Sequence, residues 1–138
     1  MKTKLQYIKI VQNLPEYPRE QEWFEFKANW FEPHPLGEYI SPLANAAAYH
    51  VHDFGYFVWG IKDKTHAIVG TDFDQTQEVK HESLAHYLER QLTPDTAFAF
   101  HELEMEGKRI VLLEIAAAKI VPTAFANVQY GTRRSTPL

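Results

Sequence analysis

The stretch that most restricts the folds open to this sequence is FGYFVWGI, residues 54–61. It is almost continuous in large apolar and aromatic side chains and shows no alternation with polar ones. A strand with one solvated face alternates, whereas a strand covered on both faces reads as an unbroken apolar run. The sequence therefore predicts a central strand here, and other elements must cover both of its faces.

Shorter patterns on either side supply those covering elements. Apolar spacing predicts helices over 4–13, from Leu36 to about residue 47, and over 81–92. Strands are predicted at EWFEFK (22–27), at HAIVGT (66–71), on both sides of the Glu106-Gly107 turn and, as a further addition, in the tail after residue 120. Pro42 removes one backbone hydrogen bond from the second helix, which is expected to kink or to be irregular in its first turns.

The order of these elements predicts the fold class. Helices interspersed with strands indicate an α/β (α+β) fold, in which helices pack on a mixed, mostly antiparallel sheet. A length of 138 residues is that of one domain. We expect residues 1–19 to form an N-terminal helix and lead-in, and residues 20–138 to form the rest of this single compact domain.

The charge and the composition exclude several classes of function. The formal net charge is −4 and the isoelectric point is about 6.0, so contact with a phosphate backbone requires a local patch of Lys and Arg. The absence of cysteine excludes disulfides and thiolate zinc sites. The start MKTKLQYIKIVQ is not a signal peptide, and no segment approaches the roughly 20 apolar residues of a membrane span. We therefore expect a cytoplasmic protein without a membrane partner.

Four segments in sequence order resemble one known family: EWFEFKANW, PLGEYISPLANAAA, GYFVWGIKDKTHAIVGT and the ending P-x-x-F…Y-x-x-R-R-S-T-x-L. Together they are similar to the Schlafen-type AlbA-like domain, formerly filed as a "divergent AAA" domain. The resemblance runs from about residue 20 to the end. It departs from the family at Pro42, which replaces the usual Ala, and at YGTRRSTPL, which lacks the glycine of the family's R-x-G-S.

The resemblance implies a DNA-binding regulatory function. In bacteria such domains commonly open proteins described as transcriptional regulators, in which a winged-helix segment follows. The chain stops where that segment would begin, so we expect either a fragment or a stand-alone domain.

Two other motifs, a P-loop and a pair of metal-binding histidines, are only partly matched by the sequence. The nearest approach to a phosphate-binding P-loop is the stretch from Gly55 to Gly60, but its interior is a bulky apolar strand rather than a loop. ATP hydrolysis of that type is therefore excluded. His50 and His52 have the spacing of a metal-binding pair, yet they fall in a predicted loop and the sequence nominates no third ligand.

The resemblance also implies a nuclease site. Eukaryotic relatives cut RNA with three acidic side chains that hold a divalent metal, and the matching positions are Glu20, Glu25 and Asp63. Carboxylate oxygens suit Mg²⁺ or Mn²⁺. Glu20 and Glu25 point to opposite faces of an ideal strand, so they converge only if Glu20 lies in the preceding loop, which Pro18 favours. The alternative is that Glu25 forms a modest ion pair with Lys27 at the sheet edge.

The candidates for phosphate contact are Lys27, Lys62, Lys64, Arg133 and Arg134. The predicted fold brings Lys27 and Lys62 close together, and Trp23 or Trp30 would add a surface on which bases stack. The alternative is that these cations form an ordinary solvated rim.

Three functions remain open at this point. The leading hypothesis is a nucleic-acid-binding regulatory domain, with DNA or RNA as partner, from a bacterial transcriptional regulator. The second is a ribonuclease that uses Mg²⁺ or Mn²⁺. The third, which the acidic isoelectric point keeps open, is a docking domain for proteins, including a second copy of the chain.

Overall fold

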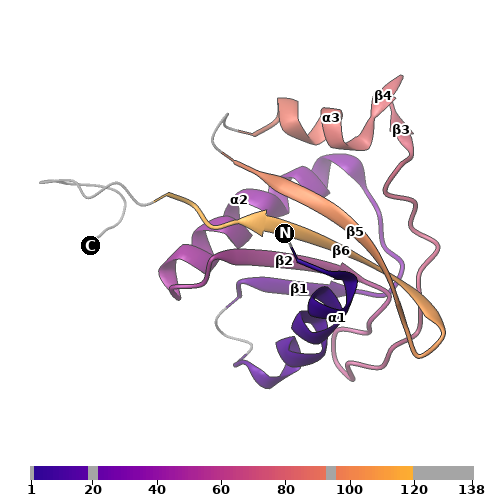
Figure 1. Ribbon diagram of the computed structural model, residues 1–138. Helices are drawn as coiled ribbons and strands as arrows, with labels where there is room; N and C mark the ends of the chain where they lie inside the picture. Colours follow the sequence, from indigo (N-terminus) through magenta and orange to yellow (C-terminus); the bar gives the residue numbers. More distant parts are fainter. Residues whose placement is uncertain (1, 19–21, 93–95, 120–138) are drawn as a thin grey trace, which may run out of the picture.

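The computed structural model describes residues 2–18, 22–92 and 96–119. In chain order the elements are α1 (Lys4–Asn13), the short 3-10 helix η1 (Leu14–Glu16), β1 (Phe24–Lys27), α2 (Pro33–Tyr49), β2 (Phe54–Trp59), β3 (Glu78–Val79), β4 (Glu82–Ser83), α3 (Leu84–Arg90), β5 (Phe98–Met105) and β6 (Lys108–Ala116). Four strands form one sheet in the order β1-β2-β6-β5, and β3 pairs with β4 separately (Figure 1). Because β1 and β2 run parallel while the other pairs are antiparallel, the predicted α+β fold with a mixed sheet is confirmed.

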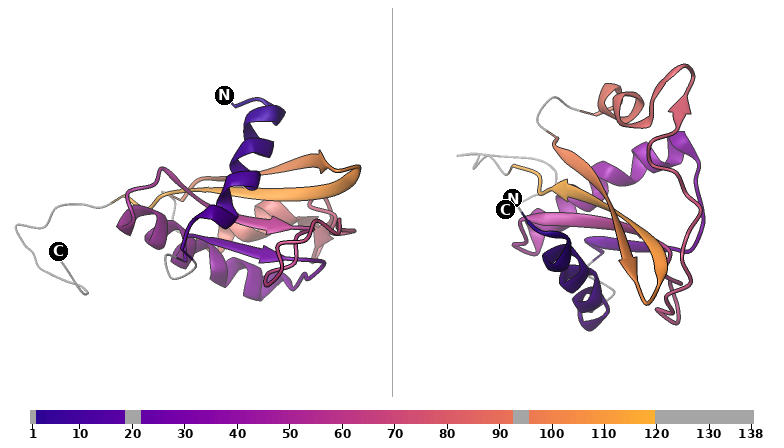
Figure 2. Two further views of the ribbon diagram at one scale, coloured as in Figure 1. Left: turned by 90° about the horizontal axis from the view of Figure 1, so that it is seen from below. Right: turned by 45° about the vertical axis from the view of Figure 1, so that its right-hand side comes forward.

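The helices lie on opposite faces of the sheet. In the left view of Figure 2, α1 stands on one side of the strands and α2 runs along the other. Along β2, Phe57 and Trp59 pack into the core beneath α2 and α3, whereas Tyr56 and Val58 pack into the core beneath α1. All four side chains are buried, so the unbroken apolar run is explained by a strand covered on both faces.

The central strand is shorter than predicted. It ends at Trp59, because Gly60 adopts a φ of +104° that an extended strand does not allow. The Gly60 amide donates to the carbonyl oxygens of Lys27 (2.8 Å) and Ala28 (3.0 Å), and its own carbonyl oxygen accepts from Val69 and Gly70. Gly60 thus joins the end of β1 to the loop that follows β2.

Helix α2 packs against strands β2 and β6. It begins at Pro33, ahead of the predicted Leu36, because a proline in the first turn lacks only an N–H that has no helical partner. Leu36, Ile40 and Leu43 form its buried stripe as predicted, and the helix continues through Pro42 to Tyr49. A Cβ atom at Gly55 would lie 2.7 Å from the Leu43 carbonyl oxygen, so a glycine is needed where α2 crosses β2.

The predicted strand over residues 66–71 is wrong. This segment is a loop whose only ladder contact in the described residues is an isolated bridge between Ile61 and Ile68. Left-handed backbone at His66 (φ +61°) and Gly70 (φ +79°) interrupts the extended conformation on both sides of a short apolar run. Two or three apolar residues are too few to indicate a strand when the backbone on both sides turns.

The third helix is also shorter than predicted. His81 has a φ of +71°, and the helix begins at Leu84 with the Ser83 hydroxyl accepting from the His86 amide at 3.1 Å. Residues 78–83 form the small β3–β4 hairpin, which the sequence analysis missed. The other predicted hairpin is confirmed, with Glu106 (φ +53°) and Gly107 (φ +73°) between β5 and β6. The strand proposed for the tail lies outside the described residues.

Candidate functional site

Three of the predicted basic residues lie at the same end of the parallel strands β1 and β2. Lys27 is the last residue of β1, and its carbonyl oxygen accepts from Gly60, two residues before Lys62. Lys62 and Lys64 are exposed on the turn that follows, where the Lys62 amide donates to the Ala67 carbonyl oxygen at 3.0 Å. We call Lys27, Lys62 and Lys64 the lysine edge.

An aromatic side chain accompanies this edge. The Lys27 ammonium lies 5.6 Å from the ring centroid of Trp30, a cation–π distance. The Trp30 ring is stacked on Phe57 with centroids 5.8 Å apart, and the Trp30 carbonyl oxygen accepts from the Trp59 indole at 2.6 Å. Because its ring and its backbone are both held by β2, Trp30 offers a fixed, partly exposed surface beside Lys27.

Two of the three predicted carboxylates line one cavity. The cavity has a volume of about 600 Å³ and lies between β1 and the middle of α2. Its lining includes Glu22, Glu25 and Asp63 together with Tyr39 and Leu43. We call it the acidic cavity; Glu25 and Asp63 both line it, and their role as metal ligands stays a prediction.

The remaining predicted site residues, Glu20, Arg133 and Arg134, lie outside the described residues. Within the described part, no three His, Asp or Glu side chains are close enough together to hold a metal ion. The His50–His52 pair does not form such a site either, because the His52 ring is stacked on Trp23 with centroids 3.8 Å apart. The described carboxylates therefore supply two of the three oxygen donors that the resemblance requires.

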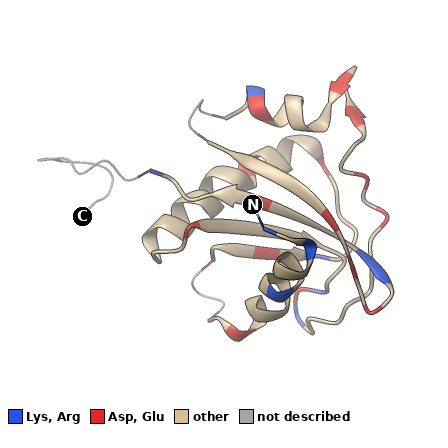
Figure 3. Ribbon diagram, viewed as in Figure 1, with Lys and Arg blue, Asp and Glu red and all other residues tan. Residues whose placement is uncertain are grey.

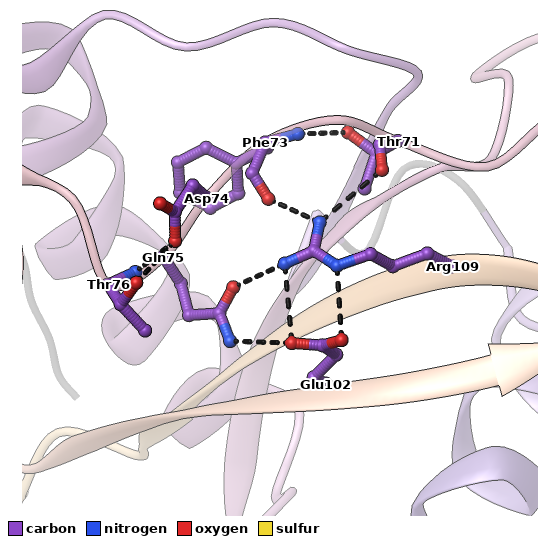
Figure 4. Close-up of polar contacts among 7 residues, drawn as sticks. All are labelled: Thr71, Phe73, Asp74, Gln75, Thr76, Glu102 and Arg109. Carbon is purple, nitrogen blue, oxygen red and sulfur yellow. Dashed lines mark hydrogen bonds and ion pairs between the residues drawn. The ribbon is translucent and has the colours of Figure 1, made fainter.

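A network around Arg109 holds the segment that continues from the lysine edge. The guanidinium donates to the backbone carbonyl oxygens of Thr71 and Phe73 and to the side chain of Gln75 at 2.7 Å, and it pairs with Glu102 at 3.2 Å (Figure 4). At the start of the same segment, the Thr71 hydroxyl donates to Asn29 at 2.7 Å. The loop carrying Lys62 and Lys64 is thus anchored at both of its ends.

A second polar cluster, which no sequence pattern predicted, lies on the opposite face of the sheet. Glu114 lies two residues before the end of β6 and is 8% exposed. Its carboxylate accepts from the Lys2 ammonium at 3.0 Å and from the Tyr7 hydroxyl at 3.2 Å, and His101 Nε2 lies 3.9 Å away. A single glutamate inside the apolar run IVLLEIA was the only sequence signal, because Lys2 and Tyr7 are more than a hundred positions away.

Burial shifts the pKa values of the titratable side chains in and around this cluster. Desolvation, with a smaller contribution from the Glu114 charge, raises the pKa of Tyr7 and of Tyr56, so both phenols stay protonated near neutral pH. Desolvation also lowers the pKa of His101; the Lys2 charge acts in the same direction, whereas Glu114 opposes it. His101 is therefore neutral near pH 7, and its buried Nε2 has no hydrogen-bond partner in the described part of the protein.

The fold and the site define an α+β domain in which the lysine edge and the acidic cavity lie beside the parallel pair of strands, β1 and β2. The model of the family described as Schlafen, AlbA_2 matches residues 20–135, which is most of the chain. The protein therefore belongs to this family, and it is a nucleic-acid-related domain. No significant similarity to a curated protein was found. None of the helices in the described ranges is both long and apolar enough to cross a membrane.

Proposed function

We propose that this domain binds nucleic acid along the lysine edge. The observation that carries the proposal has two parts: the Lys27 ammonium lies 5.6 Å from the ring centroid of Trp30, and the Gly60 amide bonds to Lys27 just before the turn that carries Lys62 and Lys64. Lysines contact phosphates as point charges, and an aromatic face stacks on a base of any sequence. Figure 3 shows acidic and basic positions interspersed over the molecule, so a local edge rather than the overall field must attract the phosphates.

Salt dependence provides the test. Anisotropy of labelled short single-stranded RNA, single-stranded DNA and duplex DNA is measured from about 50 to about 200 mM salt. Affinity should fall steeply over this range, and the double variant Lys62→Glu/Lys64→Glu should reduce the slope of log affinity against log salt by about two. The matched control is Lys9→Glu/Lys80→Glu, which makes the same charge change at exposed positions elsewhere. Equal losses in both double variants, or affinity that ignores salt, would refute binding at this edge.

A second candidate function is metal-dependent cleavage of RNA, and the acidic cavity favours it. In the sequence, Glu25 lies two residues before Lys27, and Asp63 lies between Lys62 and Lys64. A bound divalent cation would offset the repulsion between these carboxylates and the phosphates that the lysines attract. Glu25 and Asp63, with Glu20, would hold Mg²⁺ or Mn²⁺, which can activate water and stabilise the charge on a phosphodiester. Cleavage of a structured RNA with Mn²⁺ should vanish in Glu25→Gln and Asp63→Asn, whereas Asp72→Asn should retain it. Wild-type protein that cleaves nothing with either metal would exclude this function.

We propose further that nucleic-acid binding serves regulation, as in a bacterial, cytoplasmic transcriptional regulator with a winged-helix segment. The support is the family membership. Selection of bound duplexes from random DNA distinguishes a regulator, which enriches a recurring sequence, from a general binder, which enriches none. A domain that binds no nucleic acid at low salt would instead favour docking to a protein, including a second copy of itself.

A further inference from the structure

We propose that a cavity on the α1 side of the sheet binds the primary ammonium group of a small amine. The cavity has a volume of about 300 Å³ and lies between α1 and the start of β2. Six of its lining residues carry the argument: Lys2, Tyr17, Trp23, Asp53, Phe54 and Tyr56. We call it the aromatic cavity.

The walls suit a cation. Tyr17 packs edge-on against Trp23, with ring centroids 4.8 Å apart, and Phe54 and Tyr56 extend the aromatic lining along β2. The negative faces of such rings attract an ammonium group, and the attraction grows when the cation is shielded from water. The His52 ring is stacked on one face of Trp23, so the rings that carry the argument are Tyr17, Phe54 and Tyr56. A neutral guest of the same size would lack this attraction.

The protein already places an ammonium group in this lining. The Lys2 ammonium lies 4.1 Å from the ring centroid of Phe54 and 3.0 Å from a carboxylate oxygen of Glu114. One end of the cavity is therefore built to receive an alkylammonium. A second ammonium group, from a small amine, would bind along the rest of the same lining.

The rest of the lining holds two oxygen acceptors. Tyr56 is 6% exposed, and its hydroxyl makes no hydrogen bond within the described part of the chain. Asp53 is exposed at the mouth and forms no ion pair with a described residue. An ammonium can donate N–H groups to both oxygens at once. Among the described residues, the two carboxylates of Asp53 and Glu114 outnumber the single ammonium of Lys2, which favours one further positive charge.

This site is separate from the lysine edge. Trp23 and Phe54 lie at the beginning of β1 and β2, whereas Lys27 and Lys62 lie at or beyond the other end of these strands. Amine binding therefore stands or falls independently of nucleic-acid binding.

The test is a titration with butylammonium and, as its neutral counterpart of similar size, butan-1-ol. The indole N–H signals report binding, with Trp23 in the cavity and Trp30 and Trp59 as internal references. Butylammonium up to about 10 mM should move the Trp23 signal in a saturable way, and butan-1-ol should not. Equal shifts from the alcohol, or no shift from the ammonium, would overturn the proposal.

Three variants sharpen the result. Asp53→Asn should weaken butylammonium binding roughly tenfold or more, because a charge-assisted hydrogen bond is lost, while Asp72→Asn should leave it unchanged. Lys2→Met should strengthen binding, because it removes the internal competitor for Phe54 and Glu114. Wild-type affinity in Asp53→Asn, or weaker binding in a folded Lys2→Met, would contradict the assignment of the site.

Discussion

The two faces of the sheet are built from the same strands but are held in different ways. Towards α2 and α3 the strands present Phe57, Trp59 and alternate apolar positions of β6 (Val111, Leu113 and Ile115), and the buried residues of this core are all hydrophobic. Towards α1 they bury the charged Glu114, which is bonded to Lys2 and Tyr7. Thr71 and Glu114 are the only buried polar or charged side chains in the described part.

The difference teaches what each face specifies. Apolar burial is non-directional and scales with the area removed from water, so the apolar clusters on both faces supply stability. A buried carboxylate must keep its donors in position, so the α1 face fixes how the N-terminal segment lies. The variants below break one face at a time, beginning with the largest expected effect.

Phe57→Ala should break the α2 face. Phe57 is fully buried and its ring contacts Trp30, Tyr39 and Trp59, so truncation leaves a cavity that the neighbours cannot fill. We expect a loss of about 3–5 kcal/mol in the free energy of unfolding, measured by urea denaturation. The control Tyr49→Ala, at a 79% exposed position, should change it by less than about 0.5 kcal/mol. A loss below about 1 kcal/mol for Phe57→Ala would show that this face is not tightly packed.

Lys2→Met should weaken the α1 face to a smaller extent. It leaves the buried Glu114 carboxylate with Tyr7 as its remaining close donor, but Lys2 itself is 32% exposed, so water screens part of the pair. We expect a loss of about 1–2 kcal/mol, below that for a fully buried pair. Lys9→Met, at an exposed position of α1, is the control. Equal effects of the two substitutions would mean that the Glu114 contact fixes nothing.

Glu25→Gln should cost less than about 1 kcal/mol, because Glu25 lies half-buried at the edge of the sheet. Glu25 is on β1 opposite the buried Phe57 of β2, so it lies at the margin of the apolar core on the α2 face. Melting temperatures with and without Mn²⁺ separate its two roles. A metal that stabilises the wild type but not the variant indicates a ligand, and a metal that stabilises neither leaves Glu25 as an edge charge.

The smallest expected effect is a pH dependence carried by His101. Its pKa in the folded protein lies below the usual value of 6.5, so the unfolded chain binds the proton more readily. Its contribution to stability is full above about pH 6.5 and falls as the pH drops towards the folded pKa. Glu114, Lys2 and Tyr7 are the charged and titratable groups that face it.

His101→Phe should reduce this dependence, because it keeps the ring stacked on Tyr7, at 4.0 Å, but cannot bind a proton. The comparison is made from thermal melts at about pH 7.5 and about pH 5.5. His34→Phe, which changes an exposed histidine, is the control and should leave the dependence as in the wild type. An unchanged pH dependence in His101→Phe would assign the effect to another group.

Short sequence patterns correctly predicted those helices, strands and turns whose conformation depends on neighbouring residues alone. The run at 54–61, the stripe of α2 and the Glu106-Gly107 turn each combine a repeated spacing with a conformational requirement. The errors at 66–71 and 81–83 fall where left-handed backbone at His66 and His81 overrides the side-chain pattern. A non-glycine residue gives little warning that its backbone will turn.

The candidate site residues also divide into those that could be predicted from the sequence and those that could not. Family resemblance was needed to pair Glu25 with Asp63, because nothing in their spacing shows that one cavity receives both. The cluster at Glu114 was out of reach, since the sequence cannot show which distant donors a buried carboxylate finds. The roles of these groups, and of Glu20, Arg133 and Arg134, stay predictions for the experiments above.

Gly60 has a consequence for how this protein could change over evolutionary time. Its amide and carbonyl groups join the end of β1 to the loop after β2 through main-chain bonds alone. Main-chain bonds do not depend on which side chains the neighbouring positions carry, so Lys62 and Lys64 can be replaced without moving the loop on which they stand. Descendants of this sequence could therefore exchange one ligand for another by changing charges at these two exposed positions, while the path of the backbone stays inherited.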